Sequence, residues 1–77
     1  MSTATTTATV DNRGRIQGNP TVTEAATITA DTARLLAERL DALASNPGST
    51  AAAEAVFRSL DLITDNGNRV RFATEDF

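Results

Sequence analysis

Hydrophobic residues in the middle of the chain recur at intervals of three and four, which is the spacing of one face of an α-helix. A first stripe predicts a helix over about residues 31–45, and a second predicts a helix over about residues 50–61. The Asn46-Pro47-Gly48 segment between them favours a short connection, because proline cannot continue a helix. We therefore expect an antiparallel helix pair. Its predicted core residues are Leu36, Leu40, Leu43, Val56, Phe57 and Leu60.

Two polar segments of similar sequence flank this helical middle. Residues 10–16 (Val-Asp-Asn-Arg-Gly-Arg-Ile) and residues 63–70 (Ile-Thr-Asp-Asn-Gly-Asn-Arg-Val) each place Asp, Asn and Gly between β-branched residues, which is typical of a hairpin turn. In the first segment we expect Gly14 in the left-handed region, with the two ends of the segment paired. In the second we expect a C-terminal hairpin over about residues 62–73. This hairpin would add to the core Ile63, Val70 and Phe72.

Residues 21–29 are consistent with two local structures. Thr21 and Glu24 have the spacing of a capping box, in which each side chain satisfies a free amide at the start of a helix. The threonines and the isoleucine that follow instead weaken a helix, because β-branched side chains lose rotamer freedom there. A short helix and an extended segment are both compatible with this sequence.

Together these patterns predict an α+β fold with an N-terminal β-hairpin or extended arm, a central antiparallel helix pair and a C-terminal β-hairpin. We expect a threonine-rich arm with its hairpin over residues 1–20 and a small α+β body over residues 21–77. A chain of 77 residues buries few large side chains, and this one has no cysteine or histidine for disulfides or the usual transition-metal sites. We therefore expect association with other protein chains to supply part of the stability.

The charge of the chain limits its partners. Ten acidic residues and seven arginines, with no lysine, give a formal net charge of −3. This balance disfavours nucleic acid and anionic membranes as partners, since both attract a positive surface. The chain has no apolar run long enough to span a membrane, and its first residues lack the basic and apolar regions of a signal peptide. We therefore expect no membrane association, no export signal and a location in the cytoplasm or in a virion.

The residue types also disfavour catalysis. The chain has no His, Cys, Lys or Tyr, which supply most nucleophiles and bases that act near neutral pH. Each carboxylate has an ordinary position on a predicted turn or helix face. We expect no enzymatic activity, no catalytic residues, no cofactor and no metal site.

Two short resemblances point to DNA-binding regulators. The segment Thr9–Ile16 resembles the first hairpin of the AbrB-type swapped-hairpin transcription factors and antitoxins, which carry a similar Val-Asp-x-Arg-Gly-Arg-Ile run. That family continues with a basic helix, whereas this chain has no further basic residue until Arg34. Separately, residues 21–28 and 31–43 resemble the two helices of a helix-turn-helix regulator. For a DNA-binding regulator of this general class, the expected phosphate contacts are Arg13, Arg15, Arg34 and Arg39.

The preferred hypothesis is a non-enzymatic structural protein that acts as a small accessory subunit of a larger assembly, with a phage-type virion as the leading example. The threonine-rich, extended N-terminal arm suits strand addition to a neighbouring sheet, and an aromatic residue after two acids suits docking in a groove. The expected partners are therefore proteins, either further copies of this chain or a larger host subunit. The predicted contact residues are Thr5, Thr7, Thr9 and Phe77.

Overall fold

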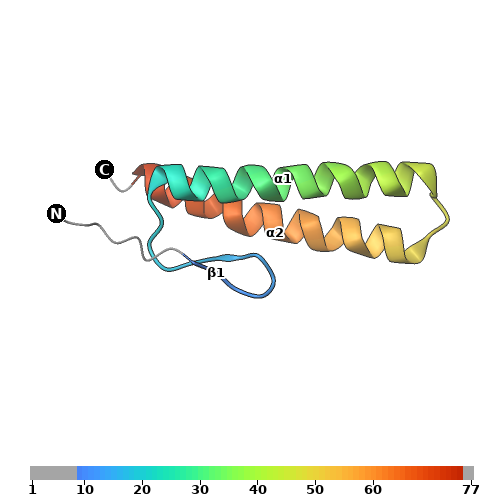
Figure 1. The fold of residues 1–77 in the computed structure, drawn as a ribbon, viewed down its shortest axis with the longest axis horizontal. Coiled ribbons are helices and arrows are strands. Elements are labelled where there is room, and N and C mark those ends of the chain that lie inside the picture. The colour runs from blue at the N-terminus through green and yellow to red at the C-terminus, as the bar shows by residue number, and fades with distance from the viewer. Residues whose placement is uncertain (1–8, 76–77) are drawn as a thin grey trace.

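A computed structural model of the chain describes residues 9–75. Two helices, α1 (Val22–Ser45) and α2 (Thr50–Glu75), run antiparallel and lie side by side (Figure 1). A hairpin of two short strands, β1 (Thr9–Val10) and β2 (Ile16–Gln17), lies beside α2, away from the loop that joins the helices (Figure 1). The expected helix pair and N-terminal hairpin are therefore confirmed, in a fold that is mostly helical.

The first helix begins with the predicted capping box. The Thr21 hydroxyl accepts a hydrogen bond from the Glu24 amide at 3.1 Å, and the Thr21 amide donates to Glu24 Oε1 at 2.8 Å. The helix then continues without a break to Ser45, so it begins at Val22 rather than near residue 31. This continuity contradicts the helix-turn-helix interpretation, which requires a turn between residues 28 and 31.

The N-terminal hairpin has the predicted turn and register. Val10 pairs with Ile16, and Gly14 has a φ of +88°, in the left-handed region that glycine adopts without strain. Asp11 closes the turn twice. Its amide donates to the Arg15 carbonyl at 3.0 Å, and its Oδ1 accepts from the amides of Arg13 at 2.8 Å and Arg15 at 3.0 Å.

The predicted C-terminal hairpin over residues 62–73 is wrong. The second helix does not end near residue 61 but continues through Asn66 and Gly67 to Glu75. Ile63 and Val70 extend the helical spacing of the earlier apolar residues of α2, and both are half-buried. Packing of these positions against α1 outweighs the local preference of Asn-Gly for a turn.

The seam between the two helices is narrow and partly polar. Its buried side chains are Ala25, Thr32, Val56, Ser59 and Asn66. Arg39 Nη1 donates across the seam to Ser59 Oγ at 2.8 Å, and Asn66 Nδ2 donates to Thr32 Oγ1 at 3.1 Å. A polar pair between helices is satisfied in one register only, so these two pairs fix how the helices are aligned.

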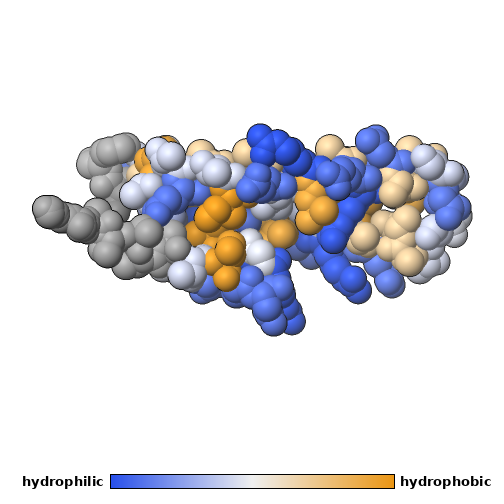
Figure 2. All heavy atoms as spheres, in the orientation of Figure 1, coloured by the Kyte–Doolittle hydropathy of each residue, from blue (hydrophilic) through white to orange (hydrophobic). Residues whose placement is uncertain are grey.

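A single chain buries only part of the predicted core. Val56 is buried, whereas Leu36, Leu43, Ile63 and Val70 are half-buried. Two helices share one seam, so large side chains on its flanks have little within the chain to pack against. Hydrophobic side chains accordingly remain visible among hydrophilic ones along the helix pair (Figure 2). The predicted core residues that are exposed instead are Leu40, Phe57, Leu60 and Phe72.

Candidate functional site

Asn66 joins the hairpin to both helices. Its side chain is fully buried, and its Oδ1 accepts a hydrogen bond from the Ile16 amide at 3.0 Å. Its Nδ2 donates to the Gly14 carbonyl and to Thr32 Oγ1, both at 3.1 Å. One side-chain amide on α2 thus satisfies two backbone groups of the hairpin and a hydroxyl of α1.

Two arginines fasten the hairpin at other points. Arg15 Nε lies 3.1 Å from Asp65 Oδ2, in an ion pair that is about half exposed on both sides. Arg69 Nη2 donates to the Gly18 carbonyl at 2.8 Å. Together with the buried Asn66 side chain, these contacts hold the hairpin against α2.

The hairpin turn favours the charged form of Asp11. The pKa of Asp11 lies below its usual value, chiefly because the backbone amides of Arg15 and Arg13 donate to the carboxylate. The guanidinium charges of the same two arginines act in the same direction. The other carboxylate oxygen accepts from Gln17 Nε2 at 3.3 Å. This negative charge is therefore engaged within the hairpin itself.

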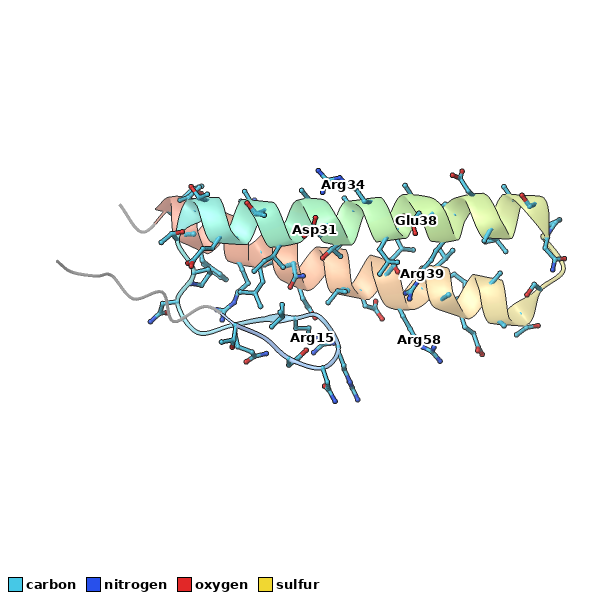
Figure 3. All side chains as sticks on the ribbon, viewed as in Figure 1. Arg15, Asp31, Arg34, Glu38, Arg39 and Arg58 are labelled. Carbon is cyan, nitrogen blue, oxygen red and sulfur yellow. The ribbon has the colours of Figure 1, made fainter. Side chains whose placement is uncertain are left out.

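Four arginine side chains line one pocket between the hairpin and the helices. The pocket has a volume of about 490 Å³. Its lining residues are Arg13, Arg15, Leu35, Arg39, Arg58 and Leu62. We call it the arginine pocket. Figure 3 shows Arg58 extending from one edge of the helix pair and Arg34 from the opposite edge, with Arg15 between the hairpin and α2.

The four guanidinium groups of the arginine pocket differ in their pairing. Arg39 is held by Ser59 and by the Ala55 carbonyl, to which its Nη1 donates at 3.3 Å. Arg15 has its single carboxylate partner on α2. Within residues 9–75, the guanidinium groups of Arg13 and Arg58 have neither a hydrogen-bond partner nor an ion-pair partner.

Each of the three arginines outside the pocket has a partner. Arg34 pairs with Asp31 on its own helix at 2.7 Å, and Arg71 lies 4.0 Å from Glu75, also on its own helix. Arg69 is bound to the hairpin backbone. The two guanidinium groups of the described residues that have no partner, those of Arg13 and Arg58, therefore both line the arginine pocket.

The pocket contains three of the four arginines that the sequence indicated as phosphate contacts. Arg13, Arg15 and Arg39 line it, and Arg34 does not. Arg58 is not among the arginines that the sequence indicated. No local pattern marks it, because it meets the other three arginines only after the chain has reversed direction between the helices.

The opposite side of the helix pair is apolar. At about 100° per residue, Leu36 and Leu40 lie on the other side of the α1 seam from Leu35, which lines the arginine pocket. By the same geometry, Phe57 and Leu60 lie on the other side of the α2 seam from the pocket residues of that helix. The apolar face, as we name it, consists of Leu36, Leu40, Phe57 and Leu60.

The four predicted partner contacts lie at or beyond the ends of the described residues. Thr5, Thr7 and Phe77 lie outside the described residues. Thr9 is the first residue of β1 and is exposed.

No three acidic side chains of residues 9–75 are grouped so that they could hold a metal ion. Neither α1 nor α2 combines the length and the apolar character that crossing a bilayer requires. Guanidinium groups stay protonated at all ordinary pH values, so the arginine pocket can attract anions but cannot act as a general base.

No family model matches the chain, and no similar protein was found among curated sequences or solved structures. The apolar face and the arginine pocket are therefore the features on which a functional assignment rests.

Proposed function

We propose that this protein is a non-enzymatic structural subunit that assembles through the apolar face of its helix pair, with a second copy of itself as the first partner. One observation carries the proposal. Leu40, Phe57 and Leu60 have 45%, 59% and 43% of their surface exposed. In the described residues, the buried hydrophobic side chains are only Ile16, Ala25 and Val56.

The exposed apolar residues of the two helices lie at the same height along the helix pair and form one surface. Arg39 reaches the Ala55 carbonyl and the Ser59 hydroxyl, which aligns its turn of α1 with residues 55–59 of α2. Leu40 follows Arg39 directly, and Phe57 lies between its two partners. The apolar side chains of the two helices are therefore neighbours across the seam.

The four residues of the apolar face carry no charge, and the nearest acidic side chains, Glu54 and Asp61, lie one turn from Phe57 at its edge. The positions that helical spacing turns toward this face are alanine, leucine, phenylalanine and threonine. They are Ala33, Leu36, Ala37, Leu40, Ala53, Phe57, Leu60 and Thr64. Small residues beside large ones allow a second helix pair to approach closely, as in a four-helix bundle with two-fold symmetry.

Association would also supply stability that the single chain lacks. Burying a Leu or Phe side chain contributes about 1.5–3 kcal/mol, and each copy would bury three that are now exposed. The same surface could pack on a larger host subunit, as the accessory-subunit hypothesis requires. A second copy is the simpler partner, because the apolar face then covers itself on both chains.

The test compares two exposed phenylalanines of α2. Phe57 lies on the apolar face and is 59% exposed, whereas Phe72 lies outside it and is 62% exposed. Sedimentation velocity over a dilution series should show that the wild-type chain and Phe72→Ser associate, and that Phe57→Ser is shifted to monomer. A wild-type chain that stays monomeric and cooperatively folded at high concentration would overturn the proposal. Equal loss of association in both variants would also overturn it.

A small DNA-binding regulator is the second candidate, and the gathering of Arg13, Arg15 and Arg39 in one pocket is the observation that favours it. Such a protein should bind duplex DNA with an affinity that falls steeply as salt rises. Arg13→Ala combined with Arg15→Ala should then abolish binding. A structural subunit should ignore DNA, and this double variant should leave its assembly unchanged.

A further inference from the structure

We propose that the arginine pocket binds a small phosphate compound of about nucleotide size. The pocket takes Arg13 and Arg15 from the hairpin, Arg39 from α1 and Arg58 from α2. Three separate elements thus contribute guanidinium groups to one volume. The guanidinium fork matches the spacing of phosphate oxygens and binds them with two parallel hydrogen bonds.

The pocket holds more positive charge than it neutralises. Asp65 is the one carboxylate of the described residues that forms an ion pair with a pocket arginine. Asp11, the other acid near the hairpin turn, already accepts hydrogen bonds from two backbone amides. Arg13 and Arg58 are therefore left with donors that a bound anion can use.

Two of the arginines are already oriented. Arg39 is fixed by a 2.8 Å hydrogen bond to Ser59 Oγ, and Ser59 is itself fully buried. Arg15 is fixed by its ion pair with Asp65. Donors that are held in place lose less conformational freedom on binding, so this half of the pocket is prepared for a ligand. Arg13 and Arg58 can close on it from the exposed side.

The size and walls of the pocket define the class of ligand. Its volume of about 490 Å³ is within the range of small-molecule sites, and it exceeds what a single phosphate group fills. Leu35 and Leu62 add an apolar wall beside the guanidinium groups. This combination suits a compound with several phosphate charges and an organic body, such as a nucleotide.

The charge outside the pocket favours a small ligand over a polymer. The chain carries ten acidic residues in all, and its only arginines outside the pocket, Arg34, Arg69 and Arg71, are each engaged. Duplex DNA would extend beyond the pocket over acidic surface, where it is repelled. A small anion in the pocket lies close to four arginines, of which only Arg15 has a carboxylate partner among the described residues.

Calorimetric titration at low ionic strength tests this proposal with three probes: magnesium-free ATP, inorganic tripolyphosphate and a DNA duplex of about 20 base pairs. Saturable binding of ATP is expected. Binding should weaken about tenfold or more in Arg58→Gln and in Arg13→Gln, because each removes one charge-assisted contact. Arg34→Gln is the matched control and should bind like the wild type. Circular dichroism of each variant confirms that it is folded.

Each outcome decides for or against the pocket. Tighter binding of ATP than of tripolyphosphate would assign a nucleotide, and equal binding would assign the phosphate chain; both support the site. Absence of saturable binding, or equal weakening by Arg34→Gln, would overturn it. Tighter binding of the duplex than of ATP would also overturn it, in favour of the regulator. The pocket and the apolar face lie on opposite sides, so Phe57→Ser should still bind ATP even if it no longer associates.

Discussion

Residues 10–16 and residues 63–70 have similar sequences and opposite structures. Both place Asp, Asn and Gly between β-branched residues, yet the first segment is a hairpin and the second lies inside α2. In the hairpin, Asp11 accepts from backbone amides of the turn. In the helix, Asn66 uses its side-chain amide for partners far away in the sequence. Similar sequences therefore stabilise a local turn in the first segment and a contact between distant parts of the chain in the second.

The two segments also depend on each other. The helical form of the second segment buries Asn66 at the seam, where it meets Ile16 and Gly14 of the first. A hairpin at residues 62–73 would remove that contact and would interrupt the packing of α2 on α1. The helix is thus selected by contacts across the fold, while the first hairpin is selected largely by its own turn.

Loss of the Asn66 side chain, which joins the hairpin to both helices, should have the largest effect on stability. Asn66→Ala removes three hydrogen bonds and leaves the Ile16 amide buried without its partner, which costs about 2–4 kcal/mol in the free energy of unfolding. Urea denaturation measures this loss, and hydrogen exchange at the Ile16 amide should become much faster. Asn68→Ala, at an exposed position of the same helix, is the control. If both variants were equally stable, Asn66 would not be the junction.

The glycine of the hairpin should not tolerate a side chain. Gly14 has a φ of +88°, and an added Cβ would lie 3.3 Å from Leu62 Cδ2. Gly14→Ala is therefore expected to destabilise the fold by about 1–2 kcal/mol, since an L-residue is strained in the left-handed region. The shift of the urea midpoint gives the value. An unchanged midpoint would mean that the turn can relax without cost.

The glycine of the helical segment should behave in the opposite way. A Cβ added at Gly67 would have no heavy atom within 4 Å beyond its own helix and chain neighbours. Gly67→Ala should stabilise the fold by about 1 kcal/mol, because alanine is the better helix former by that amount. A raised urea midpoint is expected. Destabilisation would argue that residues 63–70 are not helical in solution, and it would restore the hairpin prediction.

The sequence predicted structure well where the determinants are local. The capping box of Thr21 and Glu24 and the register of Val10 with Ile16 are each encoded within a few residues, and both were found. The extension of α2 was missed because Asn-Gly was weighed as a turn signal. The spacing of Val56, Ser59, Ile63, Asn66 and Val70 was available as a signal for a continuous helix.

The interaction sites were harder to predict because they combine distant residues. Three of the pocket arginines were named as phosphate contacts, but nothing near Arg58 in the sequence indicates that it joins them. The apolar face was found as a set of core residues. Helical spacing identifies Leu40 and Phe57 as apolar positions, but it cannot tell whether a partner within the same chain covers them.

The smallest effect concerns the charge that closes the hairpin turn. The folded state lowers the pKa of Asp11, mainly through the Arg15 and Arg13 amides, so the folded state binds this proton less well than the unfolded state. The contribution to stability is therefore present above the unfolded pKa of Asp11 and is lost as pH falls through its folded pKa.

A carboxyl titration followed by NMR should place the Asp11 midpoint below that of a peptide covering residues 9–17, and the Arg13 and Arg15 amide signals should follow the same curve. In Asp11→Asn this acid transition should disappear from both signals, because the amide side chain does not titrate. Equal midpoints in the protein and the peptide would show that docking against α2 adds nothing to the turn. A lower midpoint in the protein would show that the hairpin is held in its charged, closed form by contacts that the isolated segment lacks.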